Sequence, residues 1–260
     1  MPTPPPAVRA EVRDQVGYLT LDDPQRRNPL SLATMRAATE ILREFDADRS
    51  IRVTVIAAHG PAFSAGHDLT ELVDRTQDDE REIFDACSEL MTTVHRVRQP
   101  VIAQVQGLAL AAGCQLVATA DLAVAADDVR FSTPGVKIGL FCSTPMVALS
   151  RAIGRKRAMQ MLLTGQLIDA TTAADWGLIN TVVPGEQLAQ TVAELAAAIA
   201  ASSGETLAIG KRAFYEQIEV PEELTDVRMS ATMAANAVTA DAQEGIRAFL
   251  DKRTPVWQSP

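Results

Sequence analysis

Positive charge is scarce in this chain of 260 residues. It carries 24 Lys and Arg against 33 Asp and Glu, so its formal net charge is −9. That balance argues against a nucleic-acid-binding surface and provides no basic patch for an anionic membrane. An anionic ligand would therefore need positive charge that the fold collects locally.

Cysteine is also scarce, and a leader pattern is missing. Cys87, Cys114 and Cys142 are odd in number and lack metal-site spacing, which indicates reduced thiols. His59, His67 and Asp68 match no known metal spacing either, so we expect no metal. The N-terminal MPTPPPAVRA lacks the basic-then-apolar layout of a signal peptide. We expect a cytoplasmic protein whose residues 1–7 form a disordered, proline-rich lead-in.

Apolar residues, by contrast, make up 47% of the chain, enough for one sizeable core. The apolar stretch 101–126 contains Gln104, Gln106, Gln115 and Asp121. A polar load of that size is costly in a bilayer, so we expect no membrane insertion and interpret the stretch as strand, helix and strand.

Strand and helix patterns alternate in the first half of the chain. The expected strands cover 7–14, 16–22, 51–60, 101–107 and 121–127. The expected helices cover 31–48, with Ser31 as N-cap, then 78–99, and a third from about residue 111. Residues 131–145 are expected to be mostly loop, and only helical patterns follow from Met146 onward. The order predicts an α/β fold with a helical C-terminal portion.

Two loops of small residues each follow a strand and precede a helix start. They are AFSAGHD, residues 62–68, and LALAAGC, residues 108–114. Small residues allow close approach of the backbone, and a helix start presents unpaired N–H groups. Two such groups aimed at one oxygen would form an oxyanion hole, each worth roughly 3–4 kcal/mol of transition-state stabilisation. The pattern also fits two ordinary strand–helix turns, and neither loop has a phosphate-binding or nucleophile-elbow motif.

Five segments together resemble the enoyl-CoA hydratase, or crotonase, superfamily. They are AFSAGHDL, PVIAQVQGLALAAGCQLVATADLAVA, FSTPGVKIGL, TGQLIDATTAADWGLINTVVP and EGIRAFLDKR, and the match runs from about Val8 to Arg253. The resemblance implies a ClpP-like spiral of ββα units over 8–200 and a helical oligomerisation region over 201–260. It also implies homotrimers or dimers of trimers. The expected ligand is an acyl-CoA thioester, with no cofactor besides the coenzyme A of the substrate.

The resemblance also assigns roles by position. The oxyanion N–H groups fall at His67 and at Ala112, where the family usually has glycine. Coenzyme A contacts fall at Arg26, Arg27, Ala62, Ser64, Ala65, Gly66, Asp68, Leu69, Phe249 and Lys252, the last two often reaching a neighbouring subunit. Leu140, Phe141, Cys142 and Ser143 would border the acyl pocket. The alternative interpretation of Arg26, Arg27 and Lys252 is that they are solvated surface charges. The alternative for Asp68 is that it caps the helix that follows it.

The pattern breaks where the family's hydratases carry two catalytic glutamates. Those positions hold Gln115 and Gly135, and neither can transfer a proton near neutral pH. We therefore expect an acyl-CoA enzyme of the hydratase/isomerase family without efficient hydration. Decarboxylation, isomerisation, thioester hydrolysis and acyl-CoA binding without catalysis all stay open. So do an acid–base role for the His67 side chain and a nucleophilic role for Cys142.

Overall fold

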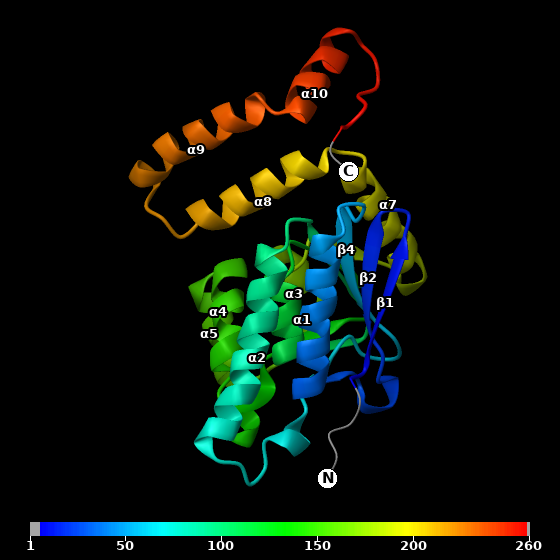
Figure 1. Cartoon of the computed structure of the whole chain (residues 1–260). Helices are drawn as coiled ribbons and strands as arrows, with labels where there is room; N and C mark the ends of the chain where they lie inside the picture. The colour runs from blue at the N-terminus through cyan, green and yellow to red at the C-terminus, as the bar shows by residue number, and fades with distance from the viewer. Residues whose placement is uncertain (1–5, 259–260) are drawn as a thin grey trace.

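A six-stranded sheet forms the centre of the fold, in the order β1-β2-β4-β6-β8-β11. The structure is a computed structural model and describes residues 6–258 (Figure 1). β1 and β2 pair antiparallel, and every later neighbour pairs parallel. The strands are β1 (Val8–Arg13), β2 (Val16–Leu21), β4 (Val53–Ala58), β6 (Val101–Val105), β8 (Leu122–Ala126) and β11 (Thr181–Val183). All six residues of β4 are buried, as expected for a central parallel strand.

Two smaller sheets lie beside the main one and carry the loops of interest. One has the order β10-β9-β7, with β10 (Ile168–Asp169), β9 (Arg130–Ser132) and β7 (Leu108–Leu110). The other pairs β3 (Pro29–Leu30) with β5 (Gly66–His67) in parallel. Short 3-10 turns precede or follow these strands: η1 (Pro24–Arg26), η2 (Leu69–Glu71) and η3 (Pro134–Ile138). A fourth, η4 (Gly185–Gln187), follows β11 of the main sheet.

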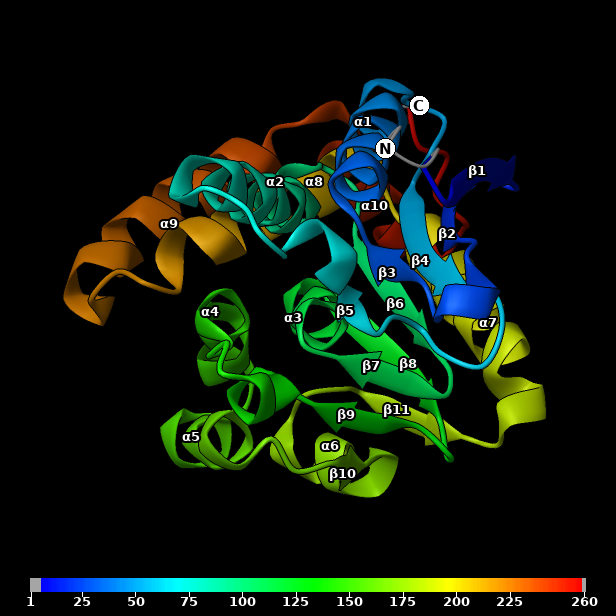
Figure 2. The same cartoon turned by 90° about the horizontal axis from the view of Figure 1, so that it is seen from below.

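Helices cover both faces of the main sheet (Figure 2). On one side lie α1 (Leu32–Ala47), α2 (Gln77–Arg96) and α3 (Ala112–Thr119), and on the other α7 (Leu188–Ala200) packs on β4, β6 and β8. α1 begins where Ser31 Oγ accepts the Thr34 N–H at 3.2 Å, which confirms the predicted N-cap. α2 begins with a capping box between Thr76 and Asp79.

Several predicted boundaries are wrong, mostly because short strands show no alternation in sequence. The strand expected over 51–60 covers only Val53–Ala58, and the helix expected over 78–99 ends at Arg96. Residues after 146 are not all helical: β10 and β11 lie there, and β11 joins the main sheet beside β8. The expected loop 131–145 holds part of β9, η3 and the start of α4 (Ser143–Ala152). Two further helices follow α4 in the chain, α5 (Arg155–Thr164) and α6 (Ala170–Trp176).

The last three helices leave the layered core. α8 (Gly204–Gln217) turns by 102° from α7 and crosses the end of α2, and α9 (Glu222–Ala237) and α10 (Ala240–Leu250) extend outward (Figure 1). Large apolar side chains are exposed there, with Val227 81% and Phe249 83% accessible.

The division of the chain into 8–200 and 201–260 stays a prediction. The expected lead-in 1–7 lies largely outside the described residues, although the carbonyl of Ala7 accepts the Asp22 N–H.

The helices were also compared with what a bilayer requires. Between residues 6 and 258, no single helix has both the length and the apolar content of a membrane span. The bent pair Gly185–Ala200 and Gly204–Gln217 meets the test by length and composition when taken together.

Candidate active site

The two predicted loops lie side by side because β7 joins them. The N–H of Ser64, in the loop 62–68, donates to the carbonyl of Leu108 at 3.1 Å. The N–H of Leu110, in the loop 108–114, donates back to the carbonyl of Ser64 at 2.9 Å. Two segments separated by about forty residues therefore form one continuous backbone structure, as an oxyanion hole requires.

Two glycines allow this backbone contact. A Cβ on Gly66, whose φ is +95°, would lie 2.9 Å from the Cβ of Ala111 and 3.4 Å from the nitrogen of Ala112. A Cβ on Gly113 would lie 2.5 Å from the carbonyl oxygen of Ser64. A side chain at either position would force the loops apart. The start of α3 is thus held against the residue that precedes His67.

Strain is concentrated at Ala111, the residue that leads into α3. Its φ of 47° and ψ of −116° are unfavourable for an L-residue, and its side chain cannot cap the helix. The N–H of Ala111 donates to the carbonyl of Ser132 at 2.9 Å, which fixes this turn to β9. Ala112 follows in the first helical turn, where the N–H has no partner within the helix. Ala112 itself has no positive φ, so alanine in place of glycine costs no strain there.

Replacing Ala111 with glycine should stabilise the protein by roughly 1 kcal/mol, because glycine adopts this backbone conformation without the penalty of a Cβ. Urea unfolding of the Ala111→Gly variant measures the change. Ala197→Gly, at an exposed position in the middle of α7, is the matched control and should destabilise by about 0.5–1 kcal/mol. Equal destabilisation in both variants would show that Ala111 is unstrained.

The side chain of His67 is partly buried beside the loop junction, and both of its ring nitrogens are inaccessible to solvent. Its ring meets Phe84 of α2 edge-on, with ring centroids 5.2 Å apart. Neither ring nitrogen has a partner of hydrogen-bond geometry among the described residues. Burial lowers the pKa of His67, and the backbone at Leu30 opposes this effect only in part. The imidazole is therefore neutral at pH 7.

The lowered pKa of His67 predicts a pH dependence of stability. Below pH 6.5 the unfolded chain binds a proton at this histidine that the folded chain does not, so stability falls as the pH drops through that range. In His67→Gln the loss between pH 6.5 and pH 5 should be smaller, as urea unfolding at stepped pH would show. His59→Gln, at a surface histidine that contacts Asp22, should retain the full loss. An unchanged slope in His67→Gln contradicts the prediction.

Gln115, which the resemblance assigns to the position of the first glutamate, is 5% exposed and bonded to a neutral partner. Its side-chain oxygen accepts a hydrogen bond from the Cys87 thiol, with sulfur and oxygen 3.8 Å apart. Burial raises the pKa of Cys87 to about 12, so this thiol stays protonated and acts as the donor. The Gln115 amide is thus oriented by a residue of α2, and it cannot accept and return a proton near neutral pH.

Gly135, which the resemblance assigns to the position of the second glutamate, lies in η3, where there is no room for a side chain. A Cβ there would lie 2.1 Å from the carbonyl oxygen of Leu140 and 2.8 Å from Sγ of Cys142. The N–H of Leu140 also donates to the carbonyl of Gly135 at 3.0 Å, which closes the turn. The place of the second acid is therefore occupied by residues that were predicted to border the acyl pocket.

Those four residues differ in exposure. Leu140 and Phe141 are 40% and 37% accessible, Ser143 is exposed, and Cys142 is buried. Burial raises the pKa of Cys142, which disfavours the thiolate that a nucleophile needs. Cys114 is fully buried in the core, as predicted. Residues 140–141 therefore expose apolar side chains, and the thiol of Cys142 is not activated.

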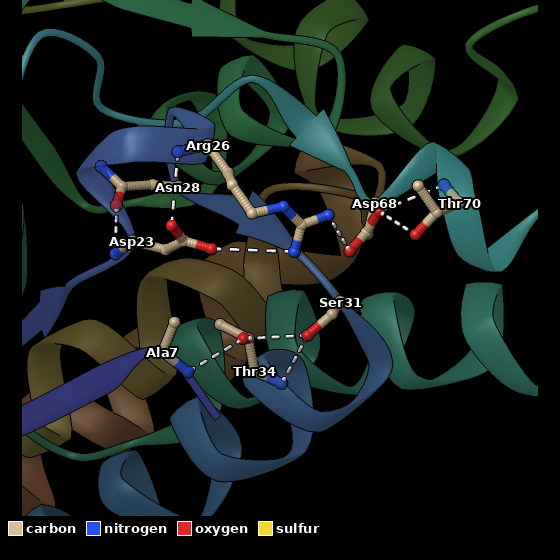
Figure 3. A network of polar contacts seen from close by, with 8 residues as sticks. All are labelled: Ala7, Asp23, Arg26, Asn28, Ser31, Thr34, Asp68 and Thr70. Atoms are coloured by element: carbon tan, nitrogen blue, oxygen red, sulfur yellow. Dashed lines mark hydrogen bonds and ion pairs between the residues drawn. The ribbon is translucent and has the colours of Figure 1, made fainter. Parts of the chain in front are cut away.

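Arg26 and Asp68, two predicted coenzyme A contacts, bond to each other (Figure 3). A guanidinium nitrogen of Arg26 lies 2.7 Å from a carboxylate oxygen of Asp68, and a second nitrogen lies 3.7 Å from Asp23. Asp68 also accepts the Thr70 N–H at 3.1 Å, which confirms its predicted capping role. The arginine side chain is 44% exposed and its charge is held at the loop surface by a buried carboxylate.

Asn28 ties this arginine-bearing loop to the first oxyanion loop. Its amide donates to the carbonyls of His59 and Ala62 at 2.9 and 2.8 Å, and its oxygen accepts the Asp23 N–H at 2.7 Å. Arg27 and Asn28 both have positive φ, 62° and 52°. The Asn28–Pro29 dipeptide is a turn signal that would have located this residue from the sequence.

The remaining predicted contacts divide into buried and exposed positions. Ala62 and Ser64 are fully buried, and Ser64 Oγ accepts the Gly66 N–H at 3.1 Å, so these side chains support the loop. Leu69 is 51% exposed beside it. Phe249 and Lys252 lie in and after α10, at the opposite end of the chain's fold from the starts of α1 and α2 (Figure 1). A single chain does not bring these two residues to the loops.

Metal-ligating side chains are scattered over the described residues, 6–258. Within them, no three His, Cys, Asp or Glu side chains are grouped so that they could hold a metal ion.

The chain as a whole matches the family model described as enoyl-CoA hydratase/isomerase over residues 11–260. It therefore belongs to the enoyl-CoA hydratase/isomerase family, the crotonase superfamily, and has its α/β fold. Among curated proteins it is 46% identical to the rat (Rattus norvegicus) enoyl-CoA hydratase domain-containing protein 3, mitochondrial. That alignment covers 94% of this chain and 82% of the relative. The human (Homo sapiens) counterpart is 44% identical over 97% of this chain and 84% of its own length.

Solved structures agree with this assignment. An enoyl-CoA hydratase from Mycobacterium smegmatis superposes with a TM-score of 0.94 at 43% identity, covering 97% of this chain and 99% of that chain. The human enoyl Coenzyme A hydratase domain-containing protein 3 gives a TM-score of 0.95 at 43% identity, covering 96% and 100%.

Proposed function

We propose that this protein binds an acyl-CoA thioester and stabilises negative charge on the thioester oxygen, without efficient hydration of an enoyl group. The observation that carries the proposal is the contact between Gly66 and the start of α3, which sets the N–H groups of His67 and Ala112 at one junction. Backbone donors in such an arrangement bind an oxyanion without reorganisation during the reaction.

The reaction class follows from what the junction contains. Gln115 and Gly135 supply no acid, and general acid–base groups are commonly worth 10²–10⁴ in rate. Water addition across a double bond requires such groups. Reactions whose main requirement is a stabilised enolate or oxyanion remain: decarboxylation, isomerisation and thioester hydrolysis. Decarboxylation needs the fewest acid–base groups among them, because loss of CO2 leaves an enolate that the oxyanion donors stabilise and that one proton from solvent quenches.

A second function, binding without turnover, is favoured by the filled position at Gly135. Leu140 and Cys142 occupy the space that a side chain at position 135 would need. A panel of crotonyl-, 3-enoyl-, malonyl- and acetyl-CoA esters separates the two functions. Calorimetric binding with turnover of any ester supports the enzyme, binding with no turnover supports the acyl-CoA-binding protein, and no binding of any ester rejects both.

Phosphate recognition is proposed for Arg26 and Arg27, because the Arg26 charge is held at the loop surface by Asp68. Affinity for coenzyme A should then weaken with added salt, and it should fall further in Arg26→Gln/Arg27→Gln. Arg155→Gln, at an exposed arginine of α5, should leave affinity unchanged. Salt-independent affinity would reject these two assignments while leaving acyl-CoA binding itself intact.

Assembly into trimers is proposed from the exposed apolar side chains of α9 and α10. An apolar surface of this kind is energetically costly when it faces water. A neighbouring copy of the chain would bury it, and Phe249 and Lys252 would then lie within reach of that copy's acyl-CoA site. Sedimentation velocity gives the mass of the assembly.

A cytoplasmic location is proposed as well, from three unpaired thiols, whereas the rat and human relatives are named mitochondrial. Cell fractionation distinguishes the two.

A further inference from the structure

A hollow of about 510 Å³ lies between the C-terminal end of α2 and α8. Arg96, Arg98, Arg212, His95, Tyr215 and Glu216 are among its lining residues, and we call it the α2–α8 cavity. His67 of the first loop meets α2 at Phe84, eleven residues before His95, so about 16 Å of helix separates the cavity from the loops. None of the residues considered above for acyl-CoA lies in it.

Positive charge dominates the α2–α8 cavity. Three guanidinium groups face one carboxylate, that of Glu216, in a chain whose net charge is −9. Arg98 is partly committed, because its donors bond the backbone carbonyls of Asp46 and Asp48. Arg96 and Arg212 are exposed, and among the side chains that the structure describes no ion pair is found for either. Their charges are therefore available to a ligand.

The back of the cavity is rigid and electrically balanced. The Lys211 ammonium lies 2.7 Å from one oxygen of Asp121, and the Tyr215 hydroxyl donates to the other oxygen at 2.7 Å. Asp121 also accepts the Val101 N–H at 2.7 Å, so this carboxylate is fully engaged and does not neutralise the arginines. The His95 ring stacks on Tyr215 with centroids 4.1 Å apart, which fixes the cavity floor.

We propose that the α2–α8 cavity binds a small anion that carries at least two negative charges, through Arg96 and Arg212. Planar guanidinium groups form paired, charge-assisted hydrogen bonds with carboxylates and phosphates. The volume suits a molecule of the size of citrate or pyrophosphate. Because Arg96 lies on α2 and Arg212 on α8, the anion would fasten the C-terminal helices to the layered core.

Titration calorimetry with citrate and with pyrophosphate tests this site, in the unmodified protein and in Arg26→Gln/Arg27→Gln, in which the phosphate contacts proposed at the loops are removed. We expect one of the two anions to bind, with a dissociation constant that rises at least tenfold in Arg96→Gln/Arg212→Gln. Arg155→Gln, outside the cavity, should bind like the unmodified protein. Citrate binding alone would assign a polycarboxylate ligand, and pyrophosphate binding alone a phosphate ligand.

Hydrogen exchange provides a second measurement on the unmodified protein, which keeps the proposal testable if the double variant is poorly folded. The bound anion should slow amide exchange in 204–217 and at the end of α2 relative to α5. The proposal is overturned if neither anion binds, if the double variant binds as tightly as the unmodified protein, or if exchange in 204–217 does not change. A failure here leaves the acyl-CoA proposal untouched, because coenzyme A binding is measured separately.

Discussion

Gly135→Ala should lower the free energy of unfolding by roughly 3 kcal/mol. The added Cβ would lie 2.1 Å from the carbonyl oxygen of Leu140, a backbone atom that moves only if the turn at 138–142 moves. Urea unfolding measures the loss. Gly210→Ala is the matched control, because nothing lies within 4 Å of its Cβ position in α8. It should stabilise by about 0.5–1 kcal/mol through helix propensity, and a neutral Gly135→Ala would contradict the crowding at η3.

The same crowding predicts that restoring the two family glutamates does not restore hydration. Gln115→Glu would place a carboxyl beside the Cys87 thiol, where burial raises its pKa. Gly135→Glu would displace Leu140 and Cys142 before its carboxyl could reach a substrate. We expect the double variant to hydrate crotonyl-CoA no more than tenfold faster than the unmodified protein. Hydration at the rate of an ordinary family hydratase would show that the turn accommodates the acid.

Asp121→Asn should destabilise the protein by about 3–5 kcal/mol, the second large expected effect. The Lys211 side chain is 6% exposed, and burial already lowers its pKa while Asp121 opposes that effect. Removing the carboxylate charge would leave a buried ammonium without its counterion. Thermal and urea unfolding measure the loss.

Two controls separate the buried pair from ordinary surface pairs. Asp85→Asn removes an exposed pair with Arg81, at 3.6 Å, and should cost no more than about 0.5 kcal/mol. Asp121→Asn/Lys211→Met removes both charges and should be more stable than Asp121→Asn alone, because no unpaired charge remains. A double variant that is as unstable as the single one would place the effect in the bonds to Tyr215 and Val101 instead.

The fold and the two loops could be predicted from the sequence because they rest on strong local signals. A six-residue buried strand, the N-cap at Ser31 and the small residues of 62–68 each have a direct pattern in the chain. The family resemblance then placed these signals in one architecture. The short strand β11 was not predicted, because three residues are too few to show an alternation of apolar and polar side chains.

The fine structure of the site could not be predicted, because it arises from contacts between distant segments. Nothing in the sequence near Gly135 shows that Leu140 folds back over it, or that Cys87 meets Gln115. The positive φ of Ala111 is likewise imposed by packing between Gly66 and β9. The α2–α8 cavity joins residues more than a hundred positions apart, so sequence spacing gave no indication of it.

The most direct test of the central claim is the loss of enoyl absorbance when crotonyl-CoA is added to the unmodified protein, with binding of the ester measured by calorimetry on the same sample. The account predicts that the ester binds and that hydration is slower than in a family hydratase with both glutamates by a factor of at least 10², the contribution of one acid–base group. Fast hydration would contradict it. That result would mean that a group other than Gln115 or Gly135 transfers the proton.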